Sequence, residues 1–166
     1  GNYEGHKSDP ELPQCVYRVD GDTGAASIVA DDVLGPNGLC FSPDESILYI
    51  VQSRGEPHRN ILAYDVIDNG ADITNKRVFI DAGPDGTPDG MRCDIDGNLW
   101  CGWGMGSEEL DGVMAYAPDG TRIGRIALPE RCANVCFGGA KRNRLFMAAS
   151  QSLYALYVNT QGVAGG

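Results

Sequence analysis

The sequence predicts an all-β fold that forms about three and a half blades of a β-propeller, each blade a four-stranded antiparallel sheet. Three observations support this prediction. The 166 residues include 23 Gly and 9 Pro with 8% aromatic residues, a composition typical of short strands joined by tight turns. No helical period is sustained over about a dozen residues. Finally, two kinds of strand–turn–strand unit recur along the chain in alternation.

The first unit is a strand, a turn rich in Asp, Asn and Gly, and a second strand. It appears as PNGLCFSPDES followed by ILYIV in residues 36–51, and as PDGMRCDIDGN followed by LWC in residues 88–101. A divergent third copy begins with CANVCFGG at residues 132–139 and ends with RLFMA at residues 144–148. Each copy is expected to form one strand pair of a blade.

The second unit is a short apolar and aromatic strand followed by a turn and another strand. It occurs four times, with its first strand at residues 16–19, 61–64, 113–116 and 153–156. The turn of the third copy, Pro118-Asp119-Gly120, has the Pro and Gly that a tight reversal requires.

The alternation of the two units divides residues 1–166, a portion of a single propeller domain, into a half blade and three blades. The predicted boundaries are residues 1–35, 36–87, 88–131 and 132–166. Because a blade packs its faces against two neighbours, an open arc of blades leaves two apolar faces exposed to water. We therefore expect a complementary propeller half, or self-association, to cover these faces.

The charge of the chain excludes two classes of partner. Thirteen basic residues against 23 acidic ones give a net charge of −10, whereas a face that binds nucleic acid or an anionic membrane needs clustered Lys and Arg. The acidic balance suits a protein that binds a cation or handles a neutral substrate, and it equally suits a solubilising surface. No apolar stretch of about 18 residues and no signal peptide is present. If the chain begins mid-protein, the absence of a signal peptide decides nothing, so the compartment stays open, with the cytoplasm slightly favoured over the periplasm.

The six cysteines do not form a familiar metal motif. They contain no C-x-x-C pair and have no nearby His, so a thiolate site is not predicted. Cys40 and Cys136 lie in apolar runs and are predicted to be buried as small hydrophobic residues. Disulfides remain open.

Asn37 and Asp89 are the strongest candidates for chemistry. Each follows Pro and precedes Gly at the start of a first-unit copy, where the innermost strand of a blade meets the central channel. An amide and a carboxylate oxygen that converge on a channel are hard ligands suited to a divalent cation. The alternative is that both segments are ordinary turns. Their common register favours the ligand interpretation, since the hairpin turns lie elsewhere, at Pro43-Asp44 and Asp96-Gly97.

Other candidates are weaker. Thr87 and Cys132 flank the channel positions and are candidates for substrate contact, and Trp103, at the glycine-rich exit of a strand, is a candidate for lining the pocket. Asp81, Asp85 and His58 are better explained as solvated loop residues. No G-x-S-x-G or H-E-x-x-H motif occurs, which excludes the common serine hydrolases and metalloproteases.

Three ordered motifs resemble the SMP-30/gluconolactonase/luciferin-regenerating-enzyme-like family: GPNGLCFSPD (35–44), TPDGMRCDIDGNLW (87–100) and CFGG (136–139). The resemblance implies the C-terminal half of a six-bladed propeller that opens sugar lactones with one divalent cation (Ca, Zn, Mn, Mg or Fe). It places a metal-ligating Asn at Asn37, and at Asp89 a metal-ligating Asp that is also the proposed general base. Residues 4–13 resemble the bacterial gluconolactonase branch. A further Glu and a further Asn of the family's site have no counterpart in this chain.

The resemblance implies hydrolysis of a gluconolactone-type sugar lactone to the aldonic acid by metal-activated water, provided that the missing blades are supplied. Three alternatives stay open. The propeller could be a non-catalytic binding module, an enzyme of another class such as a strictosidine-synthase-like protein, or an inactive truncated or split relative.

Overall fold

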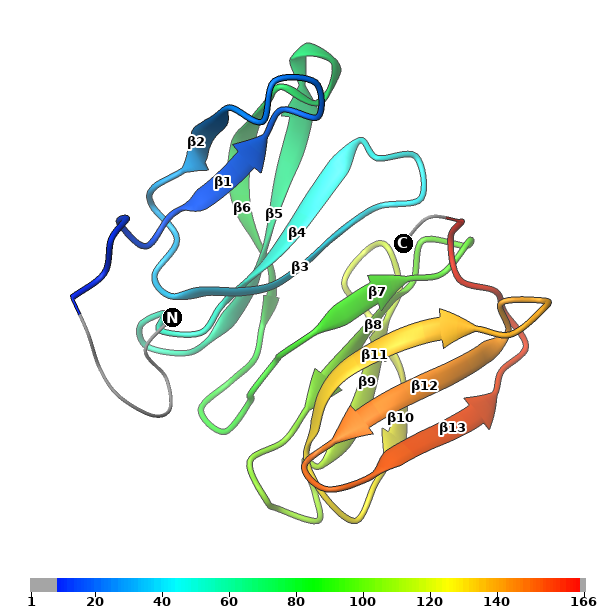
Figure 1. Cartoon of the computed structure of the whole chain (residues 1–166). Helices are drawn as coiled ribbons and strands as arrows, with labels where there is room; N and C mark the ends of the chain where they lie inside the picture. Colours follow the sequence, from blue (N-terminus) through cyan, green and yellow to red (C-terminus); the bar gives the residue numbers. More distant parts are fainter. Residues whose placement is uncertain (1–8, 165–166) are drawn as a thin grey trace.

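The computed structural model describes residues 9–164 and is all-β, with one short 3₁₀ turn at Asp68–Gly70 (Figure 1). Five residues of the 4–13 segment, 4–8, lie outside the described range. The strands are β1 (Val16–Val19), β2 (Ala26–Ala30), β3 (Pro36–Phe41), β4 (Ile47–Gln52), β5 (Asn60–Ile67), β6 (Asp72–Asp81), β7 (Met91–Cys93), β8 (Leu99–Trp103), β9 (Gly112–Tyr116), β10 (Arg122–Ala127), β11 (Cys132–Gly138), β12 (Arg144–Ala149) and β13 (Leu153–Tyr157).

These strands form four antiparallel sheets in which chain neighbours are also sheet neighbours. The sheets are β1-β2, β3-β4-β5-β6, β7-β8-β9-β10 and β11-β12-β13. The prediction of an all-β chain with four-stranded sheets is confirmed, but the last sheet has three strands instead of four within the described residues. The chain leaves this sheet after Tyr157 and returns to the third sheet, where Ile95 N–H donates to the Gln161 carbonyl at 2.9 Å and Gly162 bridges Asp94.

Adjacent sheets pack face to face and bury an apolar core at each contact. Residues 47–51 of strand β4 are all apolar because both faces of the strand are buried. Leu48 and Ile50 face the core shared with β1 and β2, whereas Tyr49 and Val51 face the core shared with β7–β9. A strand with one exposed face alternates apolar and polar residues, whereas a strand buried on both faces is apolar throughout.

Close approach of the inner strands explains the Gly in the recurring PNG and PDG segments. A methyl group on Gly38 would collide with the carbonyl oxygen of Asp89, and one on Gly90 would collide with the side chain of Asn134. Gly90 N–H donates to the Ala133 carbonyl at 2.8 Å, which joins β7 to β11. Glycine at these positions therefore sets the distance between successive sheets.

The prediction that Cys136 is buried is wrong, because this side chain lies exposed on the outer face of the last sheet. Alternation along β11 points Val135 into the core shared with Val113, and it points Cys136 to the opposite face, against which no described sheet packs. Leu153 and Tyr157 on β13 are each 70% exposed. Among the described residues, no helix is long and apolar enough to span a membrane.

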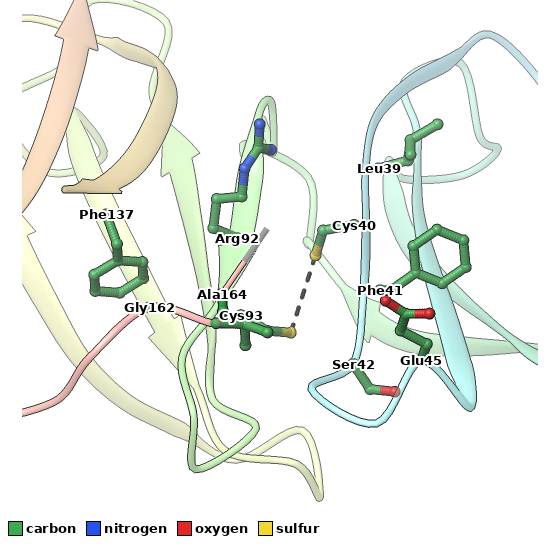
Figure 2. A pocket seen from close by; sticks show the side chains of 11 residues that line it. Leu39, Cys40, Phe41, Ser42, Glu45, Arg92, Cys93, Phe137, Gly162 and Ala164 are labelled. Atoms are coloured by element: carbon green, nitrogen blue, oxygen red, sulfur yellow. Dashed lines mark hydrogen bonds between the residues drawn. The ribbon is translucent and has the colours of Figure 1, made fainter. Parts of the chain in front are cut away.

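A cavity of about 250 Å³ lies between the second and third sheets, near the ends of β3 and β7 (Figure 2). The Cys40 and Cys93 thiols meet across it at 4.0 Å, as Figure 2 shows, and no disulfide joins the described cysteines. The hydrogen bond to Cys93 and burial both raise the pKa of Cys40. Both effects keep this thiol protonated, so the pair acts as apolar packing.

Candidate functional site

A second cavity, of about 420 Å³, lies where three sheets converge at the opposite end of the inner strands. The second sheet and its β4–β5 loop, the loops that flank β7 and β8, and the residue before β11 all contribute to it. Its lining consists of Asn37, Ser53, Arg54, Arg59, Thr87, Pro88, Asp89, Gly104, Met105 and Arg131.

The cavity brings together the two residues that the repeat places at corresponding positions. Asn37 Nδ2 donates a hydrogen bond to Asp89 Oδ1 at 2.9 Å. Asn37 lies on β3, and Asp89 precedes β7 with its backbone N–H bonded to the Gly102 carbonyl at 3.0 Å. Strand pairing on one side and the close approach at Gly38 on the other therefore fix both side chains at one point.

The environment of Asp89 makes its carboxylate a better proton acceptor than an exposed Asp. Burial raises its pKa, and this effect exceeds the opposing effects of the Asn37 hydrogen bond and the Arg131 charge. A raised pKa is typical of a carboxylate that accepts a proton during catalysis.

Of the three weaker candidates for substrate contact, one lines the cavity and two do not. Thr87 lines the cavity, but its hydroxyl accepts a hydrogen bond from Gly104 N–H at 2.8 Å, so it joins its loop to the end of β8. Trp103 and Cys132 are buried and do not line the cavity. Trp103 packs against Tyr116 with ring centroids 6.1 Å apart. The Cys132 thiol points at the Asn134 carbonyl, and burial raises its pKa to about 11.

The loop residues that the sequence assigns to solvent lie outside this cavity. His58 Nδ1 lies 2.9 Å from Asp81 Oδ1, and Asp85 is exposed.

Sequence reasoning missed three arginines of the cavity, Arg54, Arg59 and Arg131. They follow β4, precede β5 and precede β11, so they lie at the same end of the sheets as Asn37. The net negative charge of the chain hides this local positive cluster. Their common position beside strand ends was the signal that could have revealed them.

The described residues provide only part of a cation site. No group of three or more His, Cys, Asp or Glu side chains that could hold a metal occurs within residues 9–164. Asn37 and Asp89 offer an amide oxygen, after rotation of the amide, and carboxylate oxygens. These donors fit a hard divalent cation, which would need further ligands beyond the described residues.

Comparison with known proteins decides the family. Residues 1–151 match the sequence profile of the SMP-30/gluconolactonase/LRE-like region. The chain belongs to this family. The family includes lactonases such as a gluconolactonase from Zymomonas mobilis, which is 33% identical over 156 residues, with 89% of this chain and 41% of that protein aligned.

Solved structures of family members share the fold. A Xanthomonas campestris gluconolactonase superposes with a TM-score of 0.76 and 36% identity, covering 90% of this chain and 46% of that one. A structure from Agrobacterium tumefaciens described as the calcium-binding protein regucalcin gives a TM-score of 0.73 and 25% identity, covering 88% and 52% of the two chains. The chain therefore spans about half the length of the family members that it matches.

Proposed function

We propose that this chain is part of a sugar lactonase, which uses one divalent cation to hydrolyse a gluconolactone-type substrate to the aldonic acid once the remaining blades complete the ring. The observation that carries the proposal is the 2.9 Å contact between Asn37 and Asp89 at corresponding positions of two successive sheets. Relatives named as gluconolactonases support the substrate class. The calcium-binding description of the regucalcin structure supports a divalent cation.

Asn37 and Asp89 would hold the cation, which supplies Lewis acidity that polarises the lactone carbonyl and acidifies water. Asp89 would accept the proton of the attacking water, a role that suits a partly buried carboxylate that lines the cavity. In the structure the Asn37 amide donates a hydrogen bond to the Asp89 carboxylate, and this contact keeps the two prospective cation ligands side by side. The Thr87 contact with Gly104 fixes the loop from which Asp89 projects. Attack breaks the acyl–oxygen bond, and the ring opens to a hydroxy acid.

The test is replacement of Asp89 by Ala in the assembled protein with a completed ring. We expect the rate of acid release from glucono-1,5-lactone, measured above spontaneous hydrolysis with added divalent cation, to fall at least about 10²-fold. Asp85→Ala is the matched control, because Asp85 is an exposed carboxylate of the same loop. Near-normal turnover of Asp89→Ala would reject the assignment.

A non-catalytic binding module is the second candidate, and the metal content of the purified assembled protein separates the two. A bound divalent cation that Asn37→Ala removes, together with lactone turnover, supports the lactonase. A cation-free protein without turnover supports the binding module.

A further inference from the structure

The backbone holds Arg131 close to Asp89 through one glycine, Gly102. Asp89 N–H donates to the Gly102 carbonyl at 3.0 Å, and a Cβ atom on Gly102 would lie only 2.6 Å from the Cys132 carbonyl oxygen. On its other side, the Arg131 carbonyl accepts a hydrogen bond from Ser150 N–H at 3.2 Å. Both Asp89 and Arg131 therefore project from an anchored backbone, and both line the cavity of the candidate site.

The Arg131 guanidinium makes no ion pair within the described part of the chain. Four ion pairs occur there, and none of them includes Arg131. Its side-chain contact is with a thioether, because Nη1 lies 3.9 Å from Met105 Sδ. The adjacent acid, Glu130, points elsewhere, since its oxygens accept hydrogen bonds from Gln151 N–H at 2.6 Å and from Tyr154 OH at 3.0 Å. Arg131 therefore keeps its strong donors for a ligand of the cavity.

Arg59 lines the same cavity but has a structural role. Its Nε donates to the Ser53 carbonyl at 3.1 Å, and its Nη1 lies 3.5 Å from the Gly86 carbonyl oxygen. These contacts join the β4–β5 loop to the loop before β7. For Arg131, by contrast, no oxygen of the described residues accepts a hydrogen bond from the side chain, so a structural role does not account for its guanidinium.

The space near Arg131 and Asp89 sets what a ligand there must contain. The Arg131 charge acts on the Asp89 carboxyl, although the two groups do not form an ion pair. The cavity that both line, of about 420 Å³, has the volume of a small-molecule site. A ligand that meets both side chains must offer a reacting centre to a carboxylate and a negative group to a guanidinium.

Lactone hydrolysis produces this combination from a neutral substrate. Water adds to the carbonyl carbon, the acyl–oxygen bond breaks, and the proton that Asp89 takes from the water passes to the ring oxygen. The new carboxylic acid then loses its proton to solvent, which leaves a carboxylate. We infer that Arg131 is a substrate-binding residue whose guanidinium binds this new carboxylate, with the former carbonyl carbon between Arg131 and Asp89. This inference rests on the proposed lactonase function.

The experiment measures the binding of the product, gluconate, to the assembled protein by calorimetry. One fixed Ca²⁺ concentration is used throughout, so that binding of gluconate to free Ca²⁺ affects every protein equally. We expect Arg131→Met to raise the Kd of gluconate about tenfold or more, because it removes a charge-assisted hydrogen-bonded pair. Arg131→Lys should retain part of the affinity, since it keeps the charge without the planar fork.

Two controls separate carboxylate binding from other effects. Arg122→Met removes an exposed arginine of β10 that pairs with Tyr116, at the end of the third sheet away from Trp103, and it should leave the Kd of gluconate unchanged. Glucitol, which has hydroxyl groups like those of gluconate but no carboxylate, should lose no affinity in Arg131→Met. Thermal unfolding verifies that each variant is folded.

Three results would overturn the inference. The first is an unchanged Kd of gluconate in Arg131→Met. The second is an equal loss of affinity in Arg122→Met, which would mean that only the net charge of the chain matters. The third is an equal loss for gluconate and glucitol, which would assign Arg131 to the shape of the cavity and not to the carboxylate.

Lactone turnover distinguishes failure of this inference from failure of the proposed function. If gluconate binding depends on Arg131 but no lactone is hydrolysed, the lactonase proposal fails and Arg131 stands as a binding residue for a sugar acid. If glucono-1,5-lactone is hydrolysed but Arg131→Met binds gluconate as tightly as the unsubstituted protein, only the role of Arg131 fails.

Discussion

Asp94 is the residue on which the β7–β8 hairpin depends. Its side chain is fully buried, and its two carboxylate oxygens accept hydrogen bonds from Asp96 N–H at 3.0 Å, Asn98 N–H at 2.9 Å and Trp100 Nε1 at 2.9 Å. The carboxylate closes the turn and attaches it to the aromatic side chain that packs on the next sheet. A buried charge is tolerated here because its oxygens have donors.

Replacement of Asp94 by Ala should lower the free energy of unfolding by about 3 kcal/mol or more, since several donors lose their charged acceptor at once. Urea denaturation of the assembled protein measures this loss. Asp96→Ala is the control, because the Asp96 side chain makes only a 3.4 Å contact with Thr160. Equal effects of the two substitutions would contradict the role given to Asp94.

Asp44 should make the stability of the β3–β4 turn depend on pH. Hydrogen bonds from the Ser42 and Ser46 hydroxyl groups lower the pKa of Asp44 from 3.8 to about 2. A lowered pKa in the folded state stabilises the fold above pH 4 or so, and this stabilisation is lost as the pH falls through about 2. The urea midpoint of Asp44→Asn should therefore lie below that of the unsubstituted protein at pH 6, and the difference should shrink steadily as the pH is lowered to 2. A difference that is as large at pH 2 as at pH 6 would contradict this explanation.

At the residue scale, the proximity of Asn37 and Asp89 could be predicted because a short motif recurs in register, and register fixes which end of a strand a residue occupies. The arginines could not be predicted in the same way. They lie beside strand ends, which was the available signal, but they lie in loops of different length, so no recurring motif marks them as a group. Trp103 was a candidate for lining the pocket, but alternation along β8 directs its side chain into the core instead of the cavity.

At the scale of elements, the inner strands are held together by glycine contacts as well as by side-chain packing. Gly38 and Gly90 occupy equivalent positions on β3 and before β7, and each faces the next inner strand at a distance that no side chain permits. The recurring Gly therefore has a packing role, next to the chemical role of the Asn or Asp before it.

Gly38→Ala should move Asp89 away from Asn37, because the added methyl group would meet the Asp89 carbonyl. We expect a loss of about 1–3 kcal/mol of stability from overpacking and, in the assembled protein, a loss of lactone turnover greater than the loss of folded protein explains. Gly21→Ala is a suitable control, since nothing lies within 4 Å of its Cβ position. Unchanged turnover in Gly38→Ala would show that the spacing of β3 and β7 does not control the site.

The sequence was sufficient to locate the strands because each hairpin has its own turn residues and apolar runs. It was not sufficient to describe the end of the chain. A repeat predicts a four-stranded sheet for the last copy, but hydrogen bonds to the preceding sheet draw residues 161 and 162 away. The exposure of Cys136 escaped prediction for a related reason, because an apolar run does not say whether a neighbouring sheet is present.

At the scale of the whole molecule, the described sheets follow one another in an arc (Figure 1). The two end sheets carry exposed large hydrophobic residues. Leu153 and Tyr157 on the last sheet, and Val19 and Ile28 on the first, are among the exposed large hydrophobic residues. In a propeller such faces are covered by neighbouring blades. We propose that a complementary half of the ring covers them.

Produced alone, the chain should self-associate through these faces, and sedimentation velocity should show a concentration-dependent increase in mass. The double variant Leu153→Lys/Tyr157→Lys should shift the distribution toward the monomer, because charges on the face oppose its burial. A matched pair on polar surface, Thr121→Lys/Asp119→Lys, should not. A chain that stays monomeric at all concentrations would contradict the expectation.

The return of the chain after β13 has a consequence for the order in which the molecule opens. Ile95 N–H bonds to the Gln161 carbonyl, Gly162 N–H bonds to the Arg142 carbonyl at 2.8 Å, and Val163 packs on the core between the second and third sheets. The last sheet therefore cannot swing outward while this segment stays in place. Local opening at the end of the arc should therefore be coupled to loss of protection in the β7–β8 turn, and we expect the last two sheets to exchange amide hydrogens as one cooperative unit.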